Sequence, residues 1–216
     1  MSHLPYERVT PGEPPFAFVA ADYFGPFYIK RGRCIGKRYR VLFTCLTMRA
    51  VHIEVAYSLD TSSFINALRR FIARRGSPRV IRSDNGNNLT SGEKELREAI
   101  GGWNKSKIGE FLLQKEVRWV FNPPAASHMG GIWERMIRSV LKVLNALLKN
   151  QSPNDEGLST LMCEVEAILI SRPLTKVSDD PNDLQALSPN HVLLLRAVPE
   201  RPPGIFAMND QFSQMR

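Results

Sequence analysis

The first third of the chain contains three apolar runs that have the composition and length of β-strands. They occupy residues 16–27, 39–46 and 50–56 and are rich in β-branched and aromatic side chains. The first run is expected to end at a turn at Gly25–Pro26, because glycine and proline together typically mark a turn. The second and third runs are joined by a three-residue link at 47–49, which predicts a hairpin. The pattern therefore predicts three successive strands that form a meander.

Polar residues within this region are expected on its surface. A basic segment, Lys30–Arg40, lies between the first two strands, with turns expected at Gly32 and Gly36. In the third strand, His52 and Glu54 alternate with valine and isoleucine, so they are expected on a polar face of the sheet rather than in a site.

Further along the chain, helical periodicity alternates with short apolar runs. Asp60 and the three hydroxyl residues after it have helix-capping chemistry. The pattern predicts helices over residues 63–75, 91–100, 108–116 and 159–170, and short strands over 79–82 and 117–121. Strands that alternate with helices after a meander are typical of a mixed α/β sheet flanked by helices.

Residues 121–150 contain a proline- and glycine-rich approach followed by a long amphipathic helix. Glu134 lies in its first turn and shares a face with the basic residues Arg138 and Lys142. The helix is expected to bury a stripe of apolar residues at helical spacing, namely Trp133, Ile137, Val140, Leu144, Leu147 and Leu148. A carboxylate at a helix start commonly serves only to stabilise the helix dipole.

The length and composition fit one globular domain with tails. The 216 residues and 43% apolar content allow a proper core. We expect an extended, proline-rich arm over residues 1–15, a core domain over 16–196, and a C-terminal tail over 197–216 that begins a missing downstream region. The chain has no signal-peptide pattern and no apolar run of membrane-spanning length, so we expect it to be intracellular.

The charge of the chain predicts an anionic partner. A net charge of +8 and a pI near 9.7 favour nucleic acid first and an acidic membrane surface second. The three cysteines lie in apolar or strand-like contexts and are expected to be buried, reduced thiols. With four scattered histidines and no Cys-x-x-Cys, the chain is not expected to hold structural zinc.

Three acidic residues lie where a metal site of the phosphoryl-transfer type would need them. Asp22 interrupts the first strand, Asp84 follows the fourth strand, and Glu134 opens the long helix. A charge inside an apolar strand is costly unless it is paired, hydrogen-bonded or bound to metal. A few carboxylates suffice for Mg²⁺, which also uses water and phosphate oxygens as ligands. Position alone leaves two interpretations open, because Asp84 in Asp-Asn-Gly can equally be a turn residue.

Six short motifs make the chain similar to a known family. In chain order they are Asp22–Phe27 (DYFGPF), Ile81–Gly86 (IRSDNG), Phe121–Pro124 (FNPP), His128–Glu134 (HMGGIWE), Ser171–Leu174 (SRPL) and Leu187–His191 (LSPNH). Together they resemble the catalytic core of retroviral-type integrases, specifically those of Pao/BEL-type long-terminal-repeat retrotransposons. The resemblance covers most of the chain.

The resemblance implies a ribonuclease H-like α/β fold with a five-stranded mixed sheet flanked by helices. It implies that Asp22, Asp84 and Glu134 are the catalytic triad and hold two Mg²⁺ (or Mn²⁺) ions when DNA is bound. The implied activity is that of an endonuclease and nucleotidyltransferase, which processes the 3′ ends of retroelement DNA and joins them to target DNA. Self-association as a homodimer or higher oligomer, and action in the nucleus, follow from the same resemblance.

Other residues near the motifs are weaker candidates for the same site. Asn85, Asn87 and His128 are placed by the resemblance to support the carboxylates or contact DNA, although His128 can equally serve packing. Arg138 and Lys142 are expected to contact phosphates beside the cut, with a solvated basic face as the alternative. The basic segments Lys30–Arg40 and 69–75 are further, weaker candidates for DNA contact.

The chain departs from the family in two respects. Asp84 and Glu134 are separated by a longer segment than in the retroviral pattern, which we interpret as an insertion around residues 101–109. The family's full enzymes also carry an upstream His/Cys zinc module and a small downstream β domain, for which this sequence has no counterpart. A catalytically silent remnant that binds nucleic acid or protein is therefore the alternative function. A ribonuclease that cuts RNA–DNA hybrids is a third, which the Gly-Gly-x-Trp-Glu helix argues against.

Overall fold

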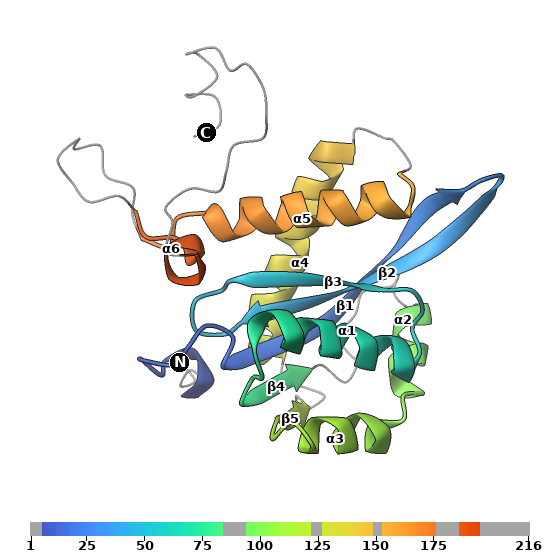
Figure 1. Cartoon of the computed structure of the whole chain (residues 1–216). Coiled ribbons are helices and arrows are strands. Elements are labelled where there is room, and N and C mark those ends of the chain that lie inside the picture. Colours follow the sequence, from blue (N-terminus) through green and yellow to red (C-terminus); the bar gives the residue numbers. More distant parts are fainter. Residues whose placement is uncertain (1–5, 84–93, 122–126, 149–152, 176–185, 195–216) are drawn as a thin grey trace, which may run out of the picture.

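Five strands form one mixed sheet in the order β3-β2-β1-β4-β5, and helices cover both of its faces (Figure 1). The computed structural model describes residues 6–83, 94–121, 127–148, 153–175 and 186–194. In chain order the elements are η1 (Tyr6–Arg8), β1 (Phe18–Arg31), β2 (Cys34–Cys45), β3 (Val51–Ala56), α1 (Thr61–Arg75), β4 (Val80–Ser83), α2 (Lys94–Gly101), α3 (Lys105–Leu113), β5 (Arg118–Phe121), α4 (Ser127–Leu148), α5 (Asp155–Ser171) and α6 (Pro189–Leu193). The predicted five-stranded mixed sheet flanked by helices is confirmed. None of the described helices is long and apolar enough to cross a bilayer.

Strand β1 lies at the centre of the sheet and is paired in two different ways. It runs antiparallel to β2, which in turn is antiparallel to β3, so the predicted meander is confirmed. Its first residues run parallel to β4, with Phe18 beside Val80 and Ala21 beside Ser83. Since β5 is parallel to β4, both strands end at the same edge of the sheet. Beyond that edge β1, β2 and β3 continue, with β3 reaching Ala56 opposite Tyr39, and β1 and β2 extend furthest.

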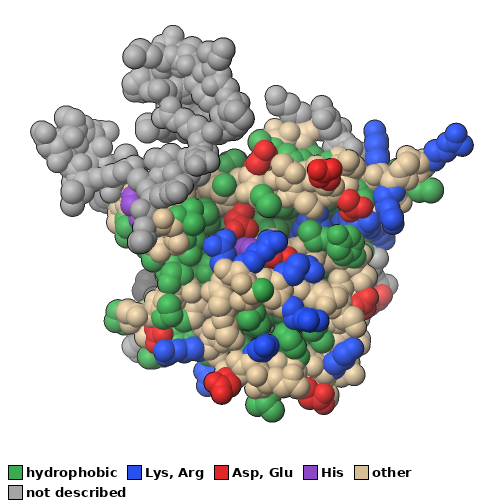
Figure 2. Space-filling view, in the orientation of Figure 1, with side chains coloured by type: hydrophobic (Ala, Val, Ile, Leu, Met, Phe, Trp, Pro, Cys, Tyr) green, Lys and Arg blue, Asp and Glu red, His purple; other side chains and the backbone are tan. Residues whose placement is uncertain are grey.

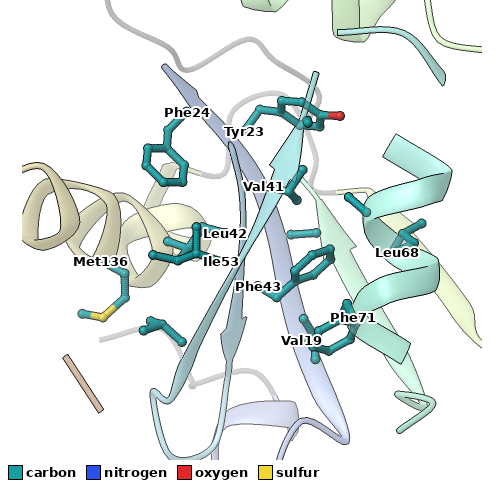
Figure 3. Close-up of a cluster of buried hydrophobic side chains, with 14 of the residues drawn as sticks. Val19, Tyr23, Phe24, Val41, Leu42, Phe43, Ile53, Leu68, Phe71 and Met136 are labelled. Atoms are coloured by element: carbon teal, nitrogen blue, oxygen red, sulfur yellow. The ribbon is translucent and has the colours of Figure 1, made fainter. Parts of the chain in front are cut away.

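The core is divided between the two faces of the sheet (Figure 3). On one face, Val19 and Phe43 pack against α1, where Phe71 stacks on Phe43 with ring centroids 4.3 Å apart. On the other face, Leu42 points towards α4 and its Met136. Alternate residues of one strand therefore serve opposite helical layers, as the pleat of a strand requires.

The first hairpin is longer than the sequence predicted. Strand β1 does not end at Gly25–Pro26; it passes through a cis peptide and an irregularity in the register there and continues to Arg31. Gly32 lies in the turn with a φ of 58°, which confirms the turn predicted there. The turn predicted at Gly36 was wrong, because this residue lies within β2 opposite Ile29. The backbone ladder resumes after the irregularity, so local turn signals were overridden by strand pairing.

Most helices follow their predicted capping and periodicity with small shifts. The prediction that Glu134 lies in the first turn of the long helix was wrong, because α4 already begins at Ser127. Asp60 caps α1, since its carboxylate accepts a hydrogen bond from the Ser63 amide at 2.7 Å. In α4, Trp133, Val140 and Leu144 are buried as predicted. Leu147, expected in the same stripe, is 37% exposed, because the last turn of α4 extends past the sheet (Figure 1).

His52 and Glu54 are buried rather than exposed, which contradicts the predicted polar face. Each side chain is 3–4% exposed, since α1 and α5 close over this edge strand. His52 lies between two carboxylates, with Nε2 3.0 Å from Glu54 and Nδ1 3.2 Å from Glu166 of α5. Arg70 and Arg75 of α1 pair with these same carboxylates. Figure 2 shows blue basic side chains gathered over α1 in this region.

Two further expectations are changed by the structure. Glu7 of the N-terminal arm is buried and pairs with Arg82 of β4 at 2.6 Å, so the arm is attached to the sheet. All three cysteines are free, but only Cys45 is buried, while Cys34 and Cys163 are exposed. Cys34 is the first residue of β2, at the turn of the hairpin, and Cys163 lies on α5, positions that local apolar context does not reveal.

Candidate active site at the end of the parallel strands

Asp22 lies on the central strand at the edge where the parallel strands end. It follows Ala21, the residue that pairs with the last residue of β4, Ser83. The side chain is buried, with the residue 8% exposed, and its Oδ1 accepts a hydrogen bond from the Tyr23 amide at 2.9 Å. Carboxyl ends of parallel strands are the usual location of sites in α/β sheets. Asp22 therefore lies on a central strand at the edge of the sheet where such sites are usually found.

The end of β4 is fixed by a side chain of its neighbour β5. The indole Nε1–H of Trp119 donates a hydrogen bond to Ser83 Oγ at 2.8 Å. Ser83 is itself buried, and Asp84 is the next residue in the chain. Asp84, Asn85 and Asn87 lie outside the described residues. The end of β4 is thus fixed by a hydrogen bond, and the predicted second carboxylate, Asp84, is the next residue in the sequence.

Glu134 lies in α4 on the side of the sheet that Asp22 also faces. Ile132 and Trp133, the residues just before it, are buried in one cluster with Ala20 of β1. Ala20 and Asp22 are two residues apart on a strand, so their side chains leave the sheet on the same face. Glu134 is half-buried. The packing of α4 therefore brings this turn of the helix to the part of β1 that holds Asp22.

The basic residues of α4 continue away from Glu134 along one side of the helix. Arg138 and Lys142 follow at intervals of four residues and are exposed. The side chain of His128 lies outside the described residues. The predicted basic side of the helix is therefore available to a polyanion.

A wall of aromatic residues closes the opposite face of β1 beside Asp22, and sequence reasoning missed it. A small cavity there is lined by Tyr23, Phe64 and Trp103 together with Asp22 and Ser83. Trp103 stacks on Phe64 at 4.5 Å, and its indole N–H donates to the Leu59 carbonyl at 2.7 Å. Burial raises the pKa of the Tyr23 hydroxyl above its ordinary value. The segment interpreted as an insertion thus contributes a side chain that packs behind the candidate site.

No group of three metal-ligating side chains lies close together among the residues that the structure describes. Asp84 lies outside these residues, so the triad of Asp22, Asp84 and Glu134 stays a prediction. Asp22 and Glu134 supply carboxylate oxygens, the ligand type that Mg²⁺ prefers in proteins.

Neither a protein-family model nor a curated protein matches this chain. Solved structures do. The HTLV-2 integrase catalytic core domain in complex with magnesium, in its dimeric form, matches with a TM-score of 0.55 and 15% identity, over 84% of this chain and 98% of that one. This chain has the ribonuclease H-like fold of retroviral integrase catalytic cores.

Two more solved structures share this fold. The trimeric form of the HTLV-2 core with magnesium matches with a TM-score of 0.52 and 17% identity, over 78% of this chain and 93% of that one. A simian T-cell lymphotropic virus intasome, solved in complex with the PP2A regulatory subunit B56 gamma, matches with a TM-score of 0.53 and 16% identity, over 96% of this chain and 66% of that one. At such identities the likeness shows the fold alone, so the roles of individual residues depend on the site itself.

Proposed function

We propose that this protein is a metal-dependent polynucleotidyl transferase of the integrase type. It cuts retroelement DNA near its 3′ ends and joins these ends to target DNA. The observation that carries the proposal is the buried carboxylate of Asp22 on the central strand, at the edge where β4 and β5 end. Asp84 follows the fixed end of β4, and Glu134 lies on the helix packed against the same face of β1.

The residues at this edge fit a pair of divalent cations. Asp22, Asp84 and Glu134 would hold these ions through their carboxylate oxygens. When bound, two such ions would supply activation of an attacking hydroxyl and stabilisation of the leaving oxygen. All three donors are carboxylates, in agreement with the preference of Mg²⁺ and Mn²⁺ for oxygen ligands.

In this proposal, neighbouring groups orient the carboxylates and bind the substrate DNA. The Tyr23 amide holds Asp22 Oδ1, so one carboxylate oxygen is oriented by the backbone itself. Trp119 holds the end of β4 through Ser83. Arg138 and Lys142 extend from Glu134 along α4 and bind phosphates flanking the cut. Asn85, Asn87 and His128 contact DNA in the same proposal.

The finer identity and the cellular setting belong to this proposal as well. The six motifs favour the Pao/BEL type of retrotransposon integrase. The HTLV-2 core is described in dimeric and trimeric forms and its simian counterpart in an intasome, which supports self-association on DNA for this chain. Its substrate would place its action in the nucleus.

A nicking and strand-transfer assay with Mg²⁺ or Mn²⁺ tests the function. Duplexes carrying a retroelement end are incubated with the wild type and with Asp22→Asn, Asp84→Asn and Glu134→Gln. Removal of one ligand charge is expected to lower the rate about 100-fold or more, since charge stabilisation dominates such reactions. Glu110→Gln, an exposed carboxylate of α3, is the matched control and should act as the wild type.

The outcomes separate the two functions under consideration. Equal joining by the wild type and the triad variants would refute the catalytic proposal. Tight DNA binding by all proteins, with no chemistry in the wild type, would support the silent nucleic-acid-binding remnant.

A further inference from the structure

Exposed basic side chains gather at the turn of the hairpin formed by β1 and β2. Residues 23–53 include no aspartate or glutamate. We define the hairpin tip as Lys30, Arg31, Arg33 and Lys37, all four of which are exposed. Figure 2 shows their region as blue side chains that stand out from the body of the molecule. Such a surface is complementary to a polyanion.

The hairpin is held firmly enough for its tip to be a defined contact point. At its base, the Arg38 guanidinium forms two hydrogen bonds to the Asp155 carboxylate of α5, at 2.6 and 2.8 Å. The hydrogen bonds from Arg38 hold the pKa of Asp155 below its ordinary value. Nearer the tip, the Lys30 amide donates to the Pro153 carbonyl at 3.1 Å, and the adjacent Ile29 is fully buried. The outer part of the hairpin is thus attached at two points, to the start of α5 and to Pro153 just before it.

The direction of the hairpin relates its tip to the candidate active site. Strand β1 pairs with β4 only up to Ala21, and from Asp22 onward it extends beyond the edge where the parallel strands end. Figure 1 shows the hairpin as a blue ribbon pointing away from β4 and β5. From Asp22 to Arg31 are nine residue steps, which span at most about 30 Å at about 3.3 Å per residue. This upper limit corresponds to about nine base pairs of duplex, at about 3.4 Å each.

We propose that the hairpin tip binds the phosphate backbone of the DNA duplex whose reacting end lies at Asp22, about eight or nine base pairs from that end. The position along the duplex rests on the proposed function, whereas the binding of duplex DNA does not. Guanidinium and ammonium groups on a strand turn contact phosphates without reading bases, so the contact is independent of sequence. The hairpin therefore sets the position of the duplex relative to the cut.

Equilibrium binding of the full chain to a duplex of about 20 base pairs tests the contact. The double variant Arg31→Ala/Arg33→Ala is expected to bind about tenfold more weakly at low salt, and its slope of log K against log salt should fall by about two. Lys115→Ala/Arg118→Ala is the matched control. It removes the same charge from two exposed residues, Arg118 at the start of β5 and Lys115 in the turn before it. These lie at the opposite end of the sheet from the hairpin tip, so the affinity and salt slope of this variant should change less.

Cross-linking from Cys34 tests the position. This exposed thiol lies next to Arg33, and Cys163→Ser removes the other exposed cysteine. Each duplex carries one disulfide-activated thiol tether, which is attached to the sugar–phosphate backbone at about 4, 8, 12 or 16 base pairs from the reacting end. The yield is expected to peak near the tether at about 8 base pairs, as the strand span requires.

These measurements distinguish a failure of the proposed hairpin contact from a failure of the proposed catalytic function. Unchanged DNA affinity and salt slope in the tip variant would overturn the inference. If this variant binds DNA as the wild type does but no longer self-associates in sedimentation, the tip is a protein interface and the inference is likewise overturned. Cross-linking that does not depend on position would overturn the positioning role. If tip binding and the cross-link peak are found but the wild type cuts no DNA, the hairpin contact stands and the proposed catalysis fails.

Discussion

Replacement of His52 by glutamine should destabilise the protein in a pH-dependent way. The imidazole is buried between the carboxylates of Glu54 and Glu166, at 3.0 and 3.2 Å. Burial alone lowers the pKa of His52, but the hydrogen bonds to Glu166 and Glu54 outweigh it and raise the pKa above 6.5, while the charge of Arg75 opposes them. Only the protonated ring has two N–H donors, so only this form satisfies both carboxylates.

The sign of the effect follows from these pKa shifts. His52 has a raised pKa in the folded state, so its stabilisation is complete below about pH 6.5 and is lost as the pH rises through the folded-state pKa. Burial raises the pKa values of Glu54 and Glu166, but the hydrogen bonds and charge of His52 outweigh it together with Arg70 at Glu54 and with Arg75 and the Ile53 amide at Glu166. Both pKa values are therefore lowered. Their contribution is present above about pH 4.5 and is lost on acidification. The network therefore stabilises the fold most between these two limits.

The structure allows the size of the effect to be worked out. Two hydrogen bonds to charged groups, at about 1.5–3 kcal/mol each, would be lost with the imidazolium. Arg70 and Arg75 continue to pair with the two carboxylates and glutamine replaces one bond, so about 2–3 kcal/mol remains as the expected loss at pH 5.5. For a chain of this size the loss corresponds to a fall in Tm of about 5–10 °C.

Urea unfolding at pH 5.5 and pH 9 measures this difference. The gap in unfolding free energy between the wild type and His52→Gln should be largest at pH 5.5 and shrink to about 1 kcal/mol at pH 9. Leu144→Ala, which removes a buried apolar side chain of α4, is the control and should cost about 2–5 kcal/mol at both pH values. An equal gap for His52→Gln at both pH values would refute the reasoning.

Three further predictions concern single positions. Arg40 is 1% exposed, and within the described part of the chain its Nε and Nη2 have no hydrogen-bond partner. Burial lowers the pKa of Arg40 to about 10, so Arg40→Met should raise the unfolding free energy by about 1–3 kcal/mol in urea titrations at pH 7, and a loss of stability would contradict this. Trp119→Phe removes the donor to Ser83 and should slow DNA nicking about tenfold while leaving DNA affinity unchanged, which a comparison of rate and binding constants checks. Arg138→Ala should reduce the salt slope of DNA binding by about one at unchanged helix content by circular dichroism, and an unchanged slope would count against a phosphate contact.

The fold was predictable because its main signals are local or periodic. The apolar stripe of α4 and the capping by Asp60 follow from spacing that a single element determines. The motif around Glu134 gave the family resemblance, and the sheet order agrees with the fold that this resemblance implies.

The wrong predictions concern side chains whose surroundings come from distant parts of the chain. His52 and Glu54 alternate as residues of an exposed strand face do, yet Glu166, more than 110 residues later, closes over them. Glycine is typical of turns, but the pairing of Gly36 with Ile29 keeps this residue within β2. Trp103 lies in a segment that was interpreted only as an insertion, and its stacking on Phe64 depends on tertiary packing. Local patterns do not encode these partners.

The central claim is that Asp22, Asp84 and Glu134 converge on a pair of divalent ions. A crystal structure of the protein with a DNA end and Mn²⁺, with phases from the anomalous signal of manganese, tests this directly. Two manganese peaks about 3.5–4 Å apart are expected, with Asp22 bound to both, Asp84 to one and Glu134 to the other. Peaks elsewhere, or a Glu134 side chain directed away from Asp22 in the DNA complex, would contradict it.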